Sequence, residues 1–253
     1  MADRDFSDFY VGYQNQAPSV LAGFLRRVVV GLLLAAVGVA AVLVLLQSRF
    51  DPGAFEYGVV RDFSGTIQET PHPLLLVDPA VAVGEELASW FLLVAVGKHG
   101  AEADVEGLDG KRVRLQGSLI YREGEAMIEV VAGSVEALDA SGAAPPVSVD
   151  LGIQTLRGEI VDSKCFLGVM KPGRGKPHRA CATRCISGGI PPVLRVETAD
   201  GDFRHFLLTD EAGGTVNDRV LDLVAEPVEV TGRVSRRGDQ LTLAADPAAY
   251  RRL

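Results

Sequence analysis

The longest apolar segment of the chain runs from Val28 to Leu46, 19 residues without a single polar side chain. At 1.5 Å per residue, a helix of this length nearly spans the hydrocarbon core of a bilayer, which is about 30 Å thick. A buried core helix is the alternative, but such helices usually keep a polar face over this length. We therefore predict a transmembrane anchor at residues 28–47, through which the chain contacts the lipid bilayer.

The residues that flank this segment bear on its cleavage and orientation. A cleaved signal peptide would have an apolar region of about 7–15 residues followed by a small-residue cleavage site, and Gln47–Asp51 offers no such site. Arg26 and Arg27 abut the N-terminal end, and basic residues favour the cytoplasmic side. We expect a single-pass anchor in the inner (plasma) membrane, with a cytoplasmic tail at 1–27 and the rest periplasmic or extracellular.

After the anchor, short β-branched runs alternate with Gly, Pro and Asp, which is the pattern of a small barrel or sandwich. Several runs are apolar at every second position, as expected for strands with one buried face. The clearest examples are Val113, Leu115 and Leu119, and Val228, Val230 and Val234. The pattern predicts a mainly β protein beyond the anchor.

The β-rich region contains two similar copies of one pattern. Phe63–Ile67 resembles Leu156–Ile160, and Val113–Gly117 resembles Val228–Gly232. The offset between copies is 93 residues at Gly65 and Gly158 but 119 at Pro73 and Pro192, so the second copy gains 26 residues between these markers. Function often lies on loops that a rigid frame supports, so the insertion is the first place to look for chemistry.

The order of runs in each copy predicts an OB-like barrel closed by a V-x-V-x-G strand and a hairpin. Gly117 and Gly232 are expected where that strand bends to close the barrel. The full architecture is one N-terminal transmembrane helix followed by two tandem small OB-like β-barrels, the second with a Cys/His-bearing loop-helix insertion. The predicted domains are 50–138 and 151–253, with a linker at 139–150 and the insertion at 162–188.

All three cysteines of the chain lie in the insertion, together with one of its four histidines. Pro177 can begin a helix and Gly188-Gly189 can end it. On such a helix His178, Cys181 and Cys185 are spaced by three and four residues and share one face. Cys165 precedes them across a turn. These four residues are candidate metal ligands, since three thiolates and an imidazole form a known structural zinc set.

Three thiols outside the cytoplasm also permit other chemistry. An odd count in an oxidising compartment leaves one thiol unpaired if a disulfide forms, and Cys165 could pair with Cys181 or Cys185. Three buried cysteines without a role are a further alternative. Soft thiolate ligands suit zinc, copper(I) or iron–sulfur clusters, but the spacing matches no iron–sulfur or haem signature. The candidate cofactors are therefore zinc or copper.

Composition and missing motifs narrow the function classes. The net charge is −8 and Trp90 is the only tryptophan, so an acidic surface without base-stacking aromatics argues against nucleic-acid binding. The basic residues around the cysteines could lower thiol pKa values, bind an anionic partner, or form a solvated face. No carboxylate pair, Ser/His/Asp set or phosphate loop can be assigned to one pocket, so an enzyme is the less favoured class.

The second copy resembles a family of uncharacterised bacterial envelope proteins with OB-like folds. The resemblance rests on Gly158–Cys165 (GEIVDSKC), His178–Cys185 (HRACATRC), Gly189–Pro191 (GIP) and Val228–Gly232 (VEVTG), and it covers roughly residues 155–245. It implies the barrel fold and the Cys/His site, and that Asp162 orients His178 or caps the turn. The first copy lacks the motif, and its His99 is expected to be a surface turn residue.

Three functional hypotheses follow. The favoured one is a membrane-anchored extracytoplasmic binding or assembly module with a Cys3His metal site, accessory to a membrane protein complex such as a redox complex. The second is a thiol-redox or copper-handling envelope protein that uses Cys165, Cys181 and Cys185. The third is a purely structural membrane tether.

Overall fold

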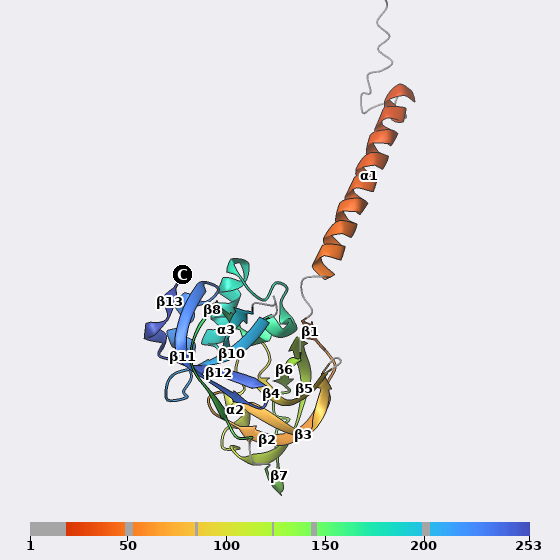
Figure 1. The fold of residues 1–253 in the computed structure, drawn as a ribbon. Coiled ribbons are helices and arrows are strands. Elements are labelled where there is room, and N and C mark those ends of the chain that lie inside the picture. Colours follow the sequence, from red (N-terminus) through yellow and green to blue (C-terminus); the bar gives the residue numbers. More distant parts are fainter. Residues whose placement is uncertain (1–18, 49–52, 84–85, 123, 143–145, 199–202) are drawn as a thin grey trace, which may run out of the picture. The chain divides into compact units, whose positions relative to one another are not determined.

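The computed structural model describes residues 19–48, 53–83, 86–122, 124–142, 146–198 and 203–253. They form one long helix and two β-barrel-like sheets, so the protein is mainly β (Figure 1). The chain divides into two compact units, Met1–Asp51 and Pro52–Leu253. Both sheets therefore belong to one unit. Most of the predicted cytoplasmic tail, residues 1–18, lies outside the described residues.

The helix α1 spans Ser19–Ser48 and contains the predicted anchor. Its segment Leu21–Leu46 is long and apolar enough to cross a membrane. Leu, Ala and Val side chains occupy all faces of this segment, and the sequence carries no charge between Arg27 and Arg49.

The first sheet contains a ring of five strands in the order β5-β2-β3-β4-β6, closed by pairing of β5 with β6. Within this ring β4 and β6 are parallel, and the other neighbours are antiparallel. Strands β1 and β7 add to β5, and the short helix α2 follows β4. The elements are β1 (Ala54–Phe55), β2 (Arg61–Gln68), β3 (Leu74–Val83), β4 (Glu86–Val94), α2 (Glu102–Val105), β5 (Lys111–Arg122), β6 (Glu125–Val130) and β7 (Glu136–Ser141).

The second sheet repeats this arrangement. Its ring has the order β12-β10-β9-β8-β11 and closes through β11 and β12, with β10 and β12 parallel. Strand β13 adds to β11, and short 3-10 turns follow β10 and β12. The elements are β8 (Val149–Asp162), β9 (Pro192–Glu197), β10 (Phe203–Thr209), η4 (Asn217–Arg219), η5 (Leu221–Leu223), β11 (Pro227–Arg237), β12 (Gln240–Ala244), η6 (Pro247–Ala249) and β13 (Arg251–Arg252).

Strands that share the repeated pattern occupy the same places in the two rings. Phe63–Ile67 lies on β2 and Leu156–Ile160 on β8, each the first ring strand of its sheet. β7 ends at Ser141 and β8 begins at Val149, both inside the segment that we predict to be a linker. The domain boundaries remain predictions.

Gly65 and Gly158 show why both copies carry a glycine at the same place. A Cβ atom on Gly65 would lie 2.2 Å from the Leu76 carbonyl oxygen, and one on Gly158 would lie 2.2 Å from the Arg195 carbonyl oxygen. The neighbouring strand therefore approaches too closely for any side chain in either ring.

Gly65→Ala and Gly158→Ala are each expected to lower the free energy of unfolding by about 1–3 kcal/mol, the usual cost of overpacking a core. Denaturant unfolding of the full chain measures the change, with Ser64→Ala on the same strand as the control. If the free energy of unfolding falls by less than about 0.5 kcal/mol, the ordinary effect of a surface substitution, the neighbouring strand can move away from the added methyl group at little cost.

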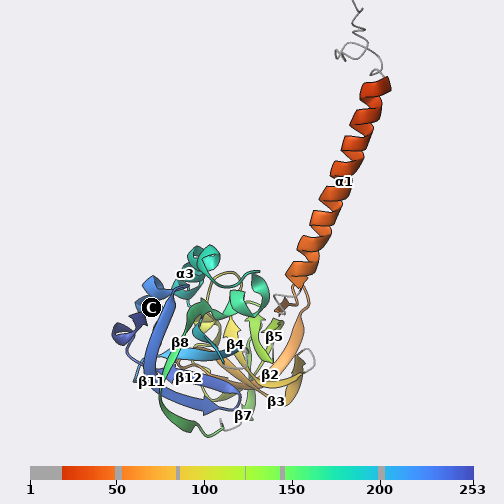
Figure 2. The same cartoon turned by 45° about the horizontal axis from the view of Figure 1, so that its top comes forward.

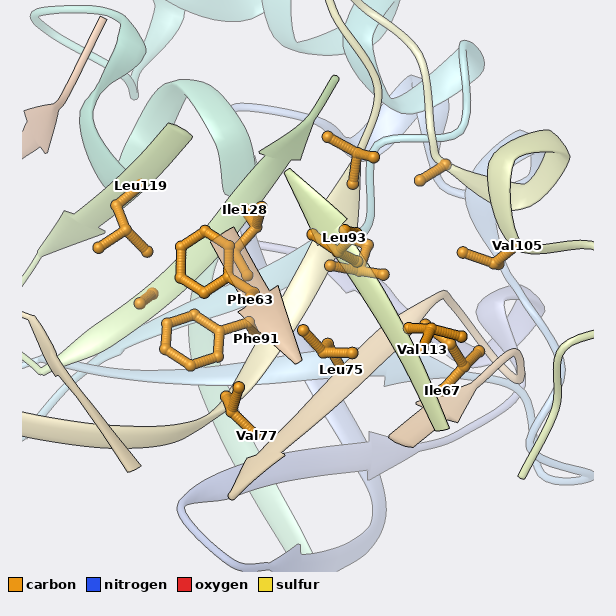
Figure 3. Close-up of a cluster of buried hydrophobic side chains, with 14 of the residues drawn as sticks. Phe63, Ile67, Leu75, Val77, Phe91, Leu93, Val105, Val113, Leu119 and Ile128 are labelled. Carbon is orange, nitrogen blue, oxygen red and sulfur yellow. The ribbon is translucent and has the colours of Figure 1, made fainter. Parts of the chain in front are cut away.

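Each ring encloses its own apolar core. In the first, Phe63 and Phe91 lie side by side at the centre with ring centroids 6.1 Å apart, between Leu119 and Leu75 (Figure 3). In the second, Ile160, Leu208 and Val230 belong to a separate buried cluster. Alternate residues along each strand supply these clusters, as the period-two pattern predicts.

The insertion connects β8 to β9 and packs against the first ring. It contains an irregular helical turn η2 (Cys165–Val169), a 3-10 turn η3 (Lys176–His178) and the helix α3 (Arg179–Ser187), drawn in turquoise in Figures 1 and 2. Cys165, Leu167, Cys185 and Ile190 share one buried cluster with first-ring side chains that include Leu92 and Met127. The insertion therefore lies where the two rings meet.

Candidate metal centre

The first candidate ligand, Cys165, is positioned by the end of β8. The Asp162 side chain accepts a hydrogen bond from the Cys165 backbone N–H at 2.8 Å through Oδ1. The Ser163 hydroxyl donates to the Pro191 carbonyl, which fastens the same turn to the segment before β9. Cys165 is thus held close to the strand end, only 3% exposed.

The other three candidates come from η3 and α3. Pro177 lies within η3, directly before α3, as the sequence predicts. The helix ends after Ser187, where Gly189 has φ of 101°, a backbone conformation that favours glycine. The carbonyl of Cys185 accepts bonds from the N–H groups of Gly188 and Ile190. This short helix presents Cys181 and Cys185 one turn apart.

The structure brings the four predicted residues together in two overlapping groups. The Cys165 sulfur lies 4.0 Å from that of Cys181 and 3.8 Å from that of Cys185. Ligand atoms of Cys165, His178 and Cys181 lie within 4.8 Å of one another, and so do those of Asp162, Cys165 and Cys185. The two groups share Cys165 and could hold a metal ion. They add Asp162 to the possible ligands.

The separations of the Cys165 sulfur from those of Cys181 and Cys185 suit an ion shared by each pair. Two thiolates bonded to zinc at about 2.3 Å with tetrahedral angles lie about 3.8 Å apart, close to the two distances above. A disulfide would need about 2.05 Å, and all three cysteines are free in the structure. The chemistry of the donor set and its spacing therefore both fit a soft or borderline metal ion.

His178 is held by a carboxylate. Its Nε2 lies 2.9 Å from Asp162 Oδ2, and both side chains are almost fully buried. A carboxylate that bonds one imidazole nitrogen leaves the other nitrogen for a metal, an arrangement common around histidine ligands. Asp162 thus contacts both His178 and the turn at Cys165, the two roles that the family resemblance implies.

Lys98, in the loop after β4, also contacts the cysteines, and no sequence motif predicts this contact. Its ammonium donates to the Cys181 sulfur at 2.8 Å and to the Cys185 sulfur at 3.4 Å. The hydrogen bond to Cys181, reinforced by the interaction with Cys185, raises the pKa of Lys98. The neighbouring His99 is exposed and belongs to neither group.

The thiols of Cys165 and Cys185 differ in acidity. The hydrogen bond with Cys165, together with the charge of Lys98, lowers the pKa of Cys185 to about 7. The same bond, burial and the Asp162 carboxylate raise the pKa of Cys165. Of these two thiols, Cys185 is therefore the more acidic. Thiolate is the form that binds metals.

Buried polar contacts join the insertion to the first ring. The Lys164 ammonium lies 2.5 Å from Glu129 Oε2 and donates to the carbonyls of Ala95 and Gly97 at 2.8 Å. Arg122 donates to the Phe166 carbonyl at 2.8 Å and places its guanidinium over the Phe166 ring. Lys164 and Phe166, the two chain neighbours of Cys165, are therefore both bonded to residues of the first barrel.

Comparison with known proteins adds no assignment. No protein-family model matches the chain, and no curated protein matches it.

Proposed function

We propose that the protein is a membrane-anchored module, placed outside the cytoplasm, in which a Cys3His zinc site fastens the insertion between two OB-like barrels. In this proposal Cys165, His178, Cys181 and Cys185 hold the ion, and the rigid double barrel is a binding or assembly module for a membrane protein complex, for example a redox complex. The position of the Cys165 sulfur, 4.0 Å from that of Cys181 and 3.8 Å from that of Cys185, beside a carboxylate-bonded histidine, carries the proposal.

A structural zinc ion is the occupant that the surroundings favour. Structural zinc sites use four protein ligands and stay closed to solvent, and Cys165, Cys185 and His178 are at most 4% exposed. Three thiolates around Zn²⁺ leave one net negative charge, which the Lys98 ammonium at 2.8 Å from Cys181 balances. When bound, the ion would cross-link η2 to η3 and α3.

The order of the strands supports the OB-like assignment. Both rings have five strands, with the third and fifth parallel and the fourth closing on the first and the fifth. A partly open, five-stranded Greek-key barrel is the general description of that fold. The same order in two consecutive copies also fits a duplicated ancestral barrel.

The membrane anchor rests on the helix α1. Its apolar segment Leu21–Leu46 exceeds the roughly 20 residues that a bilayer requires. Arg26 and Arg27 near its N-terminal end favour a cytoplasmic N-terminus. The barrels would then face the periplasm or cell exterior, where three free thiols need protection from oxidation. Bound metal would supply that protection.

A copper-handling or thiol-redox role is the second candidate. Cys181 is the least buried of the three thiols, and its sulfur accepts a hydrogen bond from the Lys98 ammonium. A partly accessible sulfur beside two further cysteines is the arrangement that metal transfer or thiol exchange would use. A purely structural tether is the third candidate and requires no chemistry from the cluster.

Metal content and thiol reactivity of the full chain in detergent micelles separate these functions. The proposal expects one zinc ion per chain by plasma mass spectrometry, no thiol that reacts in the folded protein, and three after denaturation with a chelator. Copper, or a thiol that reacts in the folded state, would favour the second function. A metal-free protein with one disulfide would overturn the zinc proposal.

Asp162→Asn is expected to weaken zinc binding by about 10–100-fold, the usual effect of removing the partner of a histidine ligand. The asparagine oxygen can still accept from the Cys165 N–H, but its amide cannot accept from His178 at the same time. Competition with a chromophoric chelator measures the affinity. Asp150→Asn, an exposed aspartate on the same strand, is the control, and equal affinities in the two variants would show that Asp162 does not orient a ligand.

A further inference from the structure

A cavity on the other side of the insertion carries an inference that goes beyond the metal site. It has a volume of about 80 Å³ and lies where the two rings and the insertion meet. Its apolar walls come from both barrels and the insertion: Trp90, Leu92, Phe166, Leu167, Leu207 and Leu241. His205 and Glu125 are its facing polar pair.

His205 has an unused ring nitrogen at this cavity. It lies on β10 and is only 8% exposed, and its ring packs 4.7 Å from that of Phe166. Nδ1 lies 2.7 Å from Glu125 Oε1, whereas the buried Nε2 has no hydrogen-bond partner among the described residues. Buried polar atoms are nearly always paired, so this nitrogen indicates a group that the chain itself does not supply.

The Glu125 contact determines what that group must offer. An ionised carboxylate only accepts hydrogen bonds, so Nδ1 carries a proton, and in the neutral imidazole Nε2 is then an acceptor. We propose that the cavity binds a small, mostly apolar molecule whose hydroxyl or N–H group donates a hydrogen bond to His205 Nε2.

The dimensions and lining agree with this class of ligand. A single water needs only about 10–15 Å³ by a comparable measure, so the cavity has room for a compact molecule of several non-hydrogen atoms. Ligand sites typically combine apolar walls with a few placed polar groups, and here the six large apolar side chains are joined by five polar residues, Glu125, Ser163, His205, Asp239 and Gln240. Ordered water is the competing occupant.

Trp90 makes the binding measurable, because the only tryptophan of the chain lines the cavity. Cyclohexanol and methylcyclohexane are probes of nearly the same size that differ in the hydroxyl group. Titration of the full chain in micelles should give a saturable change of Trp90 fluorescence with cyclohexanol. His205→Phe keeps an aromatic ring but removes Nε2, and it should raise the cyclohexanol dissociation constant about tenfold, the effect of one lost hydrogen bond.

Matched measurements separate this result from misfolding. Methylcyclohexane has no hydroxyl group and should bind the parent chain and His205→Phe with equal affinity. Equal affinity would show that the cavity of the variant has not collapsed. Leu241→Phe, which fills the cavity, should abolish the response to both probes. An absence of saturation with cyclohexanol, or equal cyclohexanol affinity in His205→Phe, would mean that the cavity holds water only. These outcomes do not depend on metal content, so the cavity and the zinc site can fail separately.

Discussion

Cys185→Ser is expected to abolish stoichiometric zinc binding and to lower the melting temperature of the barrels by well over 10 °C. Cys185 is 1% exposed and its sulfur lies 3.8 Å from that of Cys165, so serine would remove one of the buried sulfurs of the site. Metal affinity of a structural site contributes directly to folding, about 10–16 kcal/mol in zinc-finger peptides. Even a fraction of that value would shift the transition strongly.

The measurement combines metal analysis with thermal unfolding of the full chain in micelles. Ser187→Ala, an exposed change two residues along the same helix, controls for effects on α3 itself. Adding a strong chelator to the parent protein should reproduce the lower melting temperature of Cys185→Ser and leave that of the variant unchanged. If Cys185→Ser keeps both the metal and the melting temperature, Cys185 is not a ligand.

Lys164→Met is expected to lower the free energy of unfolding by about 3–5 kcal/mol, the cost of breaking a buried ion pair by removing one partner. The Lys164 side chain is 3% exposed and that of Glu129 is 14% exposed. Methionine would leave Glu129 without its cation and the carbonyls of Ala95 and Gly97 without their donor. Denaturant unfolding with unchanged slope measures the loss.

A double variant distinguishes the loss of the pair from general damage. In Lys164→Met/Glu129→Leu no charge remains unpaired, so part of the lost stability should return, since apolar replacement of a buried pair is often neutral. Lys111→Met, at an exposed lysine of β5, should change stability by less than about 0.5 kcal/mol. If the double variant is no more stable than Lys164→Met, the ion pair does not explain the effect.

Several features of the fold follow from local sequence patterns. The run Val28–Leu46 is helical because its side chains are apolar on all faces, and period-two alternation locates strands such as β5 and β11. The difference between the repeat offsets of 93 and 119 residues locates the insertion. The helix α3 lies between Pro177 and Gly188, the residues that predict its start and its end. The spacing of Cys181 and Cys185 then places two sulfurs on one face of that helix.

Contacts between distant segments could not be predicted in this way. Lys98 is 83 residues from Cys181, and His205 is 80 residues from Glu125. Their meeting depends on how the two barrels pack, and no periodicity encodes that packing. Lys164 stands among basic residues that resemble a solvated surface, yet it is buried against Glu129. The Lys164–Glu129 pair forms only when the insertion packs against the first barrel.

X-ray absorption at the zinc edge of the purified full chain tests the central claim most directly. The account predicts a first shell of three sulfurs at about 2.3 Å and one nitrogen at about 2.0–2.1 Å, with the nitrogen lost in His178→Ala. A shell made only of oxygen and nitrogen, or a protein that carries no metal and contains a disulfide, would contradict it.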